Sequence, residues 1–139
     1  MKTKNAFLIF FLFSLIFSGC VKDEVFEGPP TITDITITPQ APSENQPAVV
    51  KAKITDLNGM KQASVYYMTA QKAFTRVAMT AGSGGYYTAE IPGQASGVTV
   101  NYYIEAVNET DQKAWYPVDA PKTTASYTVG APMILMNEV

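Results

Sequence analysis

The sequence predicts an all-β protein, an antiparallel sandwich of about seven strands that occupies residues 31–130. Apolar and polar residues alternate with a period of two through most of this region, which is the pattern of strands with one buried face. Turn-forming residues interrupt the alternation about every 8 to 15 positions, and no stretch shows the longer period of a helix. Thr, Val, Ile and Tyr, which favour strands, are prominent after residue 30.

The first three strands are expected at residues 31–38, 48–55 and 63–70. The first is a Thr/Ile-rich run that ends at Pro39, because proline has no N–H to donate to a sheet. An Asn-Gly pair at 58–59 predicts the reversal between the second and third strands, since both residues accept positive φ angles. In the second strand, one apolar face is formed by Ala48, Val50, Ala52 and Ile54.

Four further strands complete the predicted sandwich. They are expected at residues 74–79, 86–91 and 98–107, and in a last strand that begins at Trp115 and finishes at Val129. The strand at 98–107 is the most apolar, so its inward face should lie at the centre of the core. That face is formed by Val98, Val100, Tyr102, Ile104 and Ala106.

Two segments carry a resemblance to a known family. The residues Tyr-Tyr-Thr-Ala-Glu-Ile-Pro at 86–92, and Gly97 with Val-Asn-Tyr-Tyr-Ile-Glu-Ala at 100–106, resemble the fibronectin type III and related immunoglobulin-like modules of bacterial surface and secreted proteins. The resemblance implies an immunoglobulin-like sandwich over residues 31–130. It also implies that one of the paired tyrosines Tyr102 and Tyr103 packs inward and the other caps a corner. Such modules serve as spacers, carbohydrate-binding accessories or partner-binding platforms, so a fold is implied rather than a function.

Residues 1–19 have the layout of an export signal. Lys2 and Lys4 come first, an apolar run from Ala6 to Phe17 follows, and the small pair Ser18-Gly19 precedes Cys20. The run of about 12 residues is shorter than the roughly 20 that span a bilayer. We therefore expect this segment to be cleaved.

The segment at 17–20, Phe-Ser-Gly-Cys, resembles the lipobox of bacterial lipoproteins, with Phe17 where leucine is usual. The resemblance implies that Cys20 carries diacylglycerol on its sulfur and becomes the first residue of the mature chain. Acyl chains contribute about 0.8 kcal/mol per buried methylene, so two or three chains hold a protein firmly to a membrane.

Lys22, Asp23 and Glu24 follow Cys20 closely and resemble a surface-export signal. In one group of Gram-negative bacteria, such a signal sends lipoproteins to the outer face of the outer membrane. The alternative is a charged, flexible tether without a sorting role, on a protein that faces the periplasm. We expect the tether to occupy residues 20–30, because Gly28-Pro29-Pro30 can neither extend a helix nor sit inside a sheet.

Residues 131–139 follow the predicted domain as a tail. The sequence Ile-Leu-Met-Asn-Glu-Val at 134–139 resembles the opening strand of a lamin-tail-type β domain, which follows immunoglobulin-like modules in some bacterial surface proteins. The tail is therefore expected to start a further domain or, alternatively, to add to an edge of its own sheet.

Composition excludes several function classes. With one cysteine and no histidine, the chain can form no internal disulfide, no Cys-His nucleophile and no Ser-His-Asp triad. It also lacks the Cys and His ligands that nearly all zinc sites use. Without residues 1–19 it has eight basic and twelve acidic residues, a net charge of −4. That charge argues against nucleic acid or an anionic lipid surface as the main partner. No cofactor is expected.

Polar residues in two turns are candidates for a calcium site, because calcium prefers six to eight oxygen ligands. The chain has no dense Asp-x-Asp-x-Asp loop, so turn formation is the favoured interpretation and no metal is expected. Residues 108–110 also match a glycosylation sequon. The candidate calcium residues are Asp56, Asn58, Asn108, Glu109 and Asp111.

Aromatic residues are the candidate binding surface. A flat row of rings would suit sugars or a protein partner, whereas cross-strand packing is the alternative role. Glu90 and Glu105 could form a carboxylate pair for glycoside hydrolysis, but both fall on outward strand positions of a small sandwich, so no catalytic residue is expected. The candidate surface consists of Tyr66, Tyr86, Tyr103, Trp115 and Tyr116.

The expected protein is thus a membrane-anchored, non-catalytic lipoprotein of the cell surface. Its immunoglobulin-like domain is expected to act as a spacer or protein-interaction module. The alternative is a carbohydrate-binding accessory lipoprotein of a glycan-uptake system, with a glycan rather than a protein as ligand.

Overall fold

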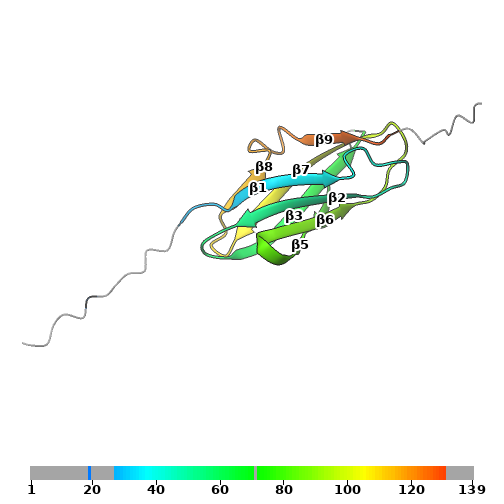
Figure 1. The fold of residues 1–139 in the computed structure, drawn as a ribbon. Helices are drawn as coiled ribbons and strands as arrows, with labels where there is room; N and C mark the ends of the chain where they lie inside the picture. The colour runs from blue at the N-terminus through cyan, green and yellow to red at the C-terminus, as the bar shows by residue number, and fades with distance from the viewer. Residues whose placement is uncertain (1–18, 20–26, 71, 131–139) are drawn as a thin grey trace, which may run out of the picture.

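Two antiparallel sheets pack face to face as an immunoglobulin-like sandwich, which confirms the predicted fold class (Figure 1). The computed structural model describes residues 19, 27–70 and 72–130. Within them, a four-stranded sheet has the order β1-β2-β6-β5, and a five-stranded sheet has the order β4-β3-β7-β8 with β9 also paired to β7. The strands are β1 (Thr31–Thr38), β2 (Ala48–Thr55), β3 (Met60–Thr69), β4 (Thr75–Ala78), β5 (Thr80–Ala81), β6 (Tyr86–Ile91), β7 (Thr99–Asn108), β8 (Lys113–Tyr116) and β9 (Ala125–Thr128).

The core lies between the sheets and is built from alternate residues of each strand. On β2 the predicted inward face is confirmed, since its four apolar residues are at most 2% exposed. On β7 the predicted face is also confirmed, and Tyr102, 5% exposed, packs against Tyr127 of β9 with ring centroids 6.3 Å apart. Alternation determines both faces because neighbouring side chains of a strand point to opposite sides of the sheet.

The chain between the predicted strands at 63–70 and 86–91 contains more regular structure than the single strand expected at 74–79. β4 is shorter than predicted, a two-residue strand β5 follows it, and residues 83–85 form a 3-10 turn, η1 (Ser83–Gly85). Gly84 and Gly85 adopt φ angles of 68° and 77°, which residues with a Cβ atom rarely adopt. The Gly82 N–H donates to the Tyr86 carbonyl at 2.7 Å and closes the turn.

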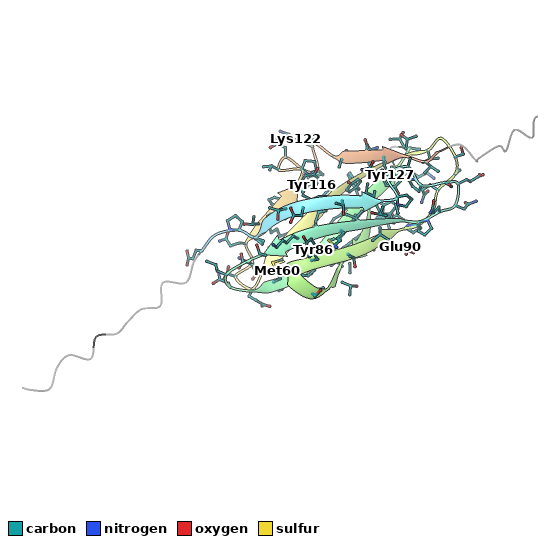
Figure 2. All side chains as sticks on the ribbon, viewed as in Figure 1. Met60, Tyr86, Glu90, Tyr116, Lys122 and Tyr127 are labelled. Carbon is teal, nitrogen blue, oxygen red and sulfur yellow. The ribbon has the colours of Figure 1, made fainter. Side chains whose placement is uncertain are left out.

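The last predicted strand is divided into two pieces. β8 pairs with the second half of β7 and β9 pairs with its first half, so both occupy the same edge of one sheet. The intervening loop, residues 117–124, leaves the sheet at Pro117, which has no N–H with which to continue the ladder. Lys122 marks this loop in Figure 2. The predicted continuous strand from Trp115 to Val129 is therefore wrong in its middle.

The described domain begins and ends at opposite ends of the sandwich. Gly28 is joined to Asn108, the last residue of β7, by a hydrogen bond of 3.0 Å. Gly130 donates to Pro42, and the neighbouring Val129 pairs with Val98, next to the start of β7. The two ends are thus separated by the ten residues of β7, about 33 Å at the usual rise per residue (Figure 1).

Several predictions fall on residues that the structure does not describe. They are the signal sequence before Gly19, the lipidation site Cys20, the export residues Lys22, Asp23 and Glu24, and the tail at 131–139. The described residues contain no candidate membrane-spanning helix.

Candidate functional site

The five candidate aromatic residues do not form one surface. Tyr66, Tyr103 and Trp115 lie on the outer face of the five-stranded sheet, where Tyr66 pairs with Tyr103 and Trp115 pairs with Glu105. Tyr86 lies on β6 of the other sheet, and Tyr116 packs against the core (Figure 2). The structure therefore brings three of the five residues to one face.

Tyr66 and Tyr103 form a stacked cross-strand pair. Their ring centroids are 4.8 Å apart and their planes differ by 4°. The edge of Phe74 meets Tyr103 at 5.0 Å and 78°. Burial, together with the neighbouring Tyr66, raises the pKa of the Tyr103 hydroxyl. Because the two rings cover each other, they stabilise the pairing of β3 and β7 instead of offering a flat platform.

This stacked pair also decides the role of Tyr103 in the fold. The family resemblance implied that one tyrosine of the pair caps a corner. Tyr103 instead lies in the middle of β7 and faces Tyr66 across the sheet, while Tyr102 packs inward as implied.

Trp115 is the most accessible aromatic residue of this face, with 36% of its surface exposed. Its indole N–H donates to the Glu105 carboxylate at 3.2 Å, and the Lys113 ammonium lies 3.5 Å from the same oxygen. Trp115 also borders an open hollow of about 480 Å³ between β8 and the start of β1. The hollow is lined by Pro29, Pro30, Thr31, Ile32, Lys113, Ala114, Trp115 and Val118.

Tyr86 contacts two neighbouring strands of its own sheet. Its hydroxyl donates to Asp34 at 3.3 Å, and the Lys51 ammonium lies 4.4 Å from the centre of its ring. Asp34 has a φ of 50° and lies where the register of β1 shifts against β2. Tyr86 therefore ties the irregular part of the edge strand β1 to the sheet.

The candidate calcium residues meet at the end of the sandwich where Gly28 joins it, but they form a hydrogen-bonded cluster. Asp56 accepts from the Asn58 backbone N–H at 2.8 Å and from the Asn108 amide at 3.1 Å. Asp111 instead pairs with Lys61 at 2.6 Å. Among the described residues, no group of three or more acidic side chains is placed to hold a metal ion.

Asn108 is the centre of this cluster, and the sequence did not reveal its role. Its side chain is fully buried and takes part in five hydrogen bonds. The amide nitrogen donates to Gly28 and Asp56, and the amide oxygen accepts from Thr110 and Gln112. The only available signal was a polar residue directly after an apolar strand. This burial also makes the sequon at 108–110 inaccessible to glycosylation in the folded domain.

Glu90 and Glu105 do not form a carboxylate pair. Glu90 lies on β6, where it faces outward opposite Val49, and Glu105 lies on β7 of the other sheet. The two side chains thus point away from opposite faces of the sandwich, and the two-carboxylate geometry of a glycoside hydrolase is absent from this pair.

Comparisons with known proteins add little. No protein-family model matches the chain, and no curated protein matches it. Among solved structures, one described as "Crystal structure of Br derivative BhCBM56", a carbohydrate-binding module, is similar with a TM-score of 0.48 and 11% sequence identity. The match covers 68% of this chain and 88% of that chain. The similarity is one of β-rich fold, and no ligand of this chain follows from it.

Proposed function

We propose that this protein is a non-catalytic lipoprotein, anchored through Cys20, whose sandwich is a spacer that holds a distal interaction surface away from the membrane. The observation that carries the proposal is the position of Gly28 and Gly130 at opposite ends of β7. A chain attached near its N-terminus to a membrane would present the Pro42 and Gly130 end about 33 Å further out than the Gly28 end. In a domain with both chain ends on one side, the end that carries Gly130 would stay next to the membrane.

Docking of the segment that precedes β1 supports the spacer role. Gly28 is held by the buried Asn108 amide, and Pro30 is buried against the domain. The part of the tether that follows Glu27 is therefore docked, in contrast to the expected flexible segment at 20–30. The docked segment continues directly into β1, so the chain from Gly28 onward belongs to the sandwich itself.

The non-catalytic role is supported by how the polar side chains are used. Glu105 is engaged by Trp115 and Lys113, and Asp56 by Asn108. Among the described residues, the largest pKa displacement belongs to Tyr127, which packs in the core, where burial raises the pKa of its hydroxyl to about 12. A buried core tyrosine with a raised pKa is a structural group rather than an acid or base at a cleft.

The resemblance of Lys22, Asp23 and Glu24 to a surface-export signal supports display on the cell surface. In the alternative, a protein that faces the periplasm, the lipid would be held by the other leaflet of the membrane. Under either orientation, the same end of the sandwich faces away from the membrane. The exposed end contains the β1–β2 loop, where Glu44 and Asn45 lie, and is the proposed site of protein contact.

Distance from the bilayer tests the spacer proposal. The variants Glu44→Cys and Glu109→Cys each introduce one cysteine into the full chain. If the proposal holds, Cys20 is acylated, so the introduced cysteine is the thiol that a fluorophore labels. Both positions are exposed, and they lie at opposite ends of the sandwich. A fluorophore at residue 109 should transfer energy efficiently to an acceptor in the lipid headgroups, and one at residue 44 should transfer much less. Equal transfer from both positions would refute an upright spacer.

A carbohydrate-binding accessory is a second candidate, and the hollow beside Trp115 is the observation that favours it. An exposed indole next to the polar Glu105 and Lys113 is a combination that suits a sugar ring. Glycan-array binding that is lost in Trp115→Ala but kept in Tyr86→Ala would support this candidate. Tyr86 is the matched control because it lies on the opposite sheet.

A further inference from the structure

Exposed apolar side chains cluster where the tether joins the domain. In the described residues, the large apolar side chains with substantial exposure are Val49 (36%), Leu57 (82%), Trp115 (36%) and Val118 (83%). Trp115 and Val118 border the hollow beside the start of β1. Leu57 borders a second hollow, of about 320 Å³, and Pro29 and Thr31 line both.

Three of these four side chains therefore flank the docked segment from its two sides. We call Leu57, Trp115, Val118 and Pro29 the apolar rim. A single exposed apolar residue needs no explanation, but a group around one segment indicates a contact surface.

The position of the anchor limits what this rim can meet. The segment from Cys20 to Glu27, both included, has eight residues, which span at most about 28 Å when fully extended. Gly28 is already fixed to the domain by Asn108. If Cys20 carries lipid, Gly28 is confined to a layer of this thickness next to the bilayer, and the rim that flanks the neighbouring Pro29 is held close to the membrane.

We propose that the apolar rim rests on the lipid bilayer interface, so that the anchored domain is seated on the membrane as well as tethered to it. This inference rests on the proposed lipoprotein function. Tryptophan favours the boundary between headgroups and acyl chains, where its ring is apolar and its N–H finds a polar partner. Lys113 lies beside Trp115 and can place its ammonium among the headgroups while its stem stays on the apolar surface.

Anchoring makes a small contact sufficient. The rim consists of a few side chains and would bind a bilayer only weakly on its own. Attachment through a short linker turns this contact into an intramolecular event at an effective concentration in the millimolar range. The net charge of −4 after removal of residues 1–19 gives no attraction to anionic lipid, so the contact is apolar and should persist at high salt and on zwitterionic membranes.

Trp115 is the only tryptophan of the chain and therefore reports on the rim directly. The full-length, processed protein is reconstituted in phosphatidylcholine vesicles whose acyl chains carry bromine, which quenches tryptophan on contact. We expect a loss of Trp115 fluorescence relative to unbrominated vesicles, strongest for bromine near the headgroups and unchanged in 0.5 M salt. The variant Leu57→Asp/Val118→Asp should reduce the quenching, whereas Val49→Asp, a control on β2, should leave it unchanged.

The outcomes separate this inference from the function on which it rests. Both side chains of the double variant are more than 80% exposed, so an unchanged melting temperature is expected and shows that the domain is folded. If the protein carries acyl groups and stays on the vesicles but Trp115 is not quenched, the seating inference is wrong and the lipoprotein function stands. If Trp115 is shielded from both brominated lipid and dissolved iodide, the rim is covered by a second copy or another protein, which also overturns the inference. If no acyl group is found on Cys20, both proposals fail.

Discussion

The side-chain amide of Asn108 donates a hydrogen bond to the Asp56 carboxylate at 3.1 Å, across 52 positions of sequence. The same amide nitrogen donates to Gly28, 80 positions away. One buried side chain thus joins the tether, the turn after β2 and the hairpin after β7. This junction holds the sandwich to the segment that leads to its proposed anchor.

Replacement of Asn108 should be among the most destabilising polar changes in the domain. Asn108→Ala removes five hydrogen bonds and leaves buried partners such as the Gly28 carbonyl unsatisfied. We expect a loss of about 2 to 4 kcal/mol in the free energy of unfolding, measured by denaturant titration. Asn101→Ala is the control, since this outward residue of β7 has only a long contact of 3.5 Å with Thr124. Equal losses in the two variants would show that Asn108 does not hold the junction.

Tyr102→Ala should destabilise the domain much more than Tyr103→Ala. Tyr102 is 5% exposed and lies in the core, where truncation of a large aromatic side chain costs about 3 to 5 kcal/mol. Tyr103 lies on the outer face and loses mainly its stacking on Tyr66, which is worth about 1 kcal/mol. Denaturation midpoints of both variants decide between them. A greater loss for Tyr103→Ala would contradict the inward and outward faces of β7.

The domain should lose stability in strongly alkaline solution through Tyr127. Burial raises the pKa of Tyr127 to about 12, above the ordinary value of 10.0 that applies when the chain is unfolded. Its contribution is complete below pH 10 and is lost as the pH rises toward 12, because the unfolded state releases the proton more easily. Thermal melts between pH 8 and pH 12 measure this effect, and Tyr127→Phe should flatten the decline. An unchanged alkaline decline in that variant would assign the effect to other groups.

Cys20→Ala should abolish membrane retention. Without the thiol no diacylglycerol can be attached, so the protein should appear in soluble fractions or stay uncleaved. Cell fractionation and labelling with palmitate measure this directly. A processed Cys20→Ala protein that stays in the outer membrane would contradict the lipoprotein interpretation.

Replacement of Lys22, Asp23 and Glu24 by alanine should change the location of the protein without changing its stability. These residues precede the docked segment that begins at Gly28, so folding and lipidation should be unaffected. Protease added to whole cells is expected to cleave the parent protein and to spare the variant. Equal protection of parent and variant would argue against surface export.

The sequence by itself determined the fold class and the inward faces of β2 and β7. Both follow from alternation, because the side chains of a strand point to its two sides in turn whatever the strand pairs with. Proline and glycine likewise predicted most strand ends, since their backbone limits are local. The break between β8 and β9 starts at Pro117, but the alternation on its two sides predicts one continuous strand.

Only the tertiary structure decided which residues meet. The pairing of β3 with β7 places Tyr66 on Tyr103, and the crossing between sheets places Tyr86 on the far side of the sandwich. Asn108 was expected to be a turn residue, yet it is buried because three distant segments of chain converge on its amide. Such contacts depend on strand order and register, which are set by the summed packing of the whole core and are not encoded in any local pattern.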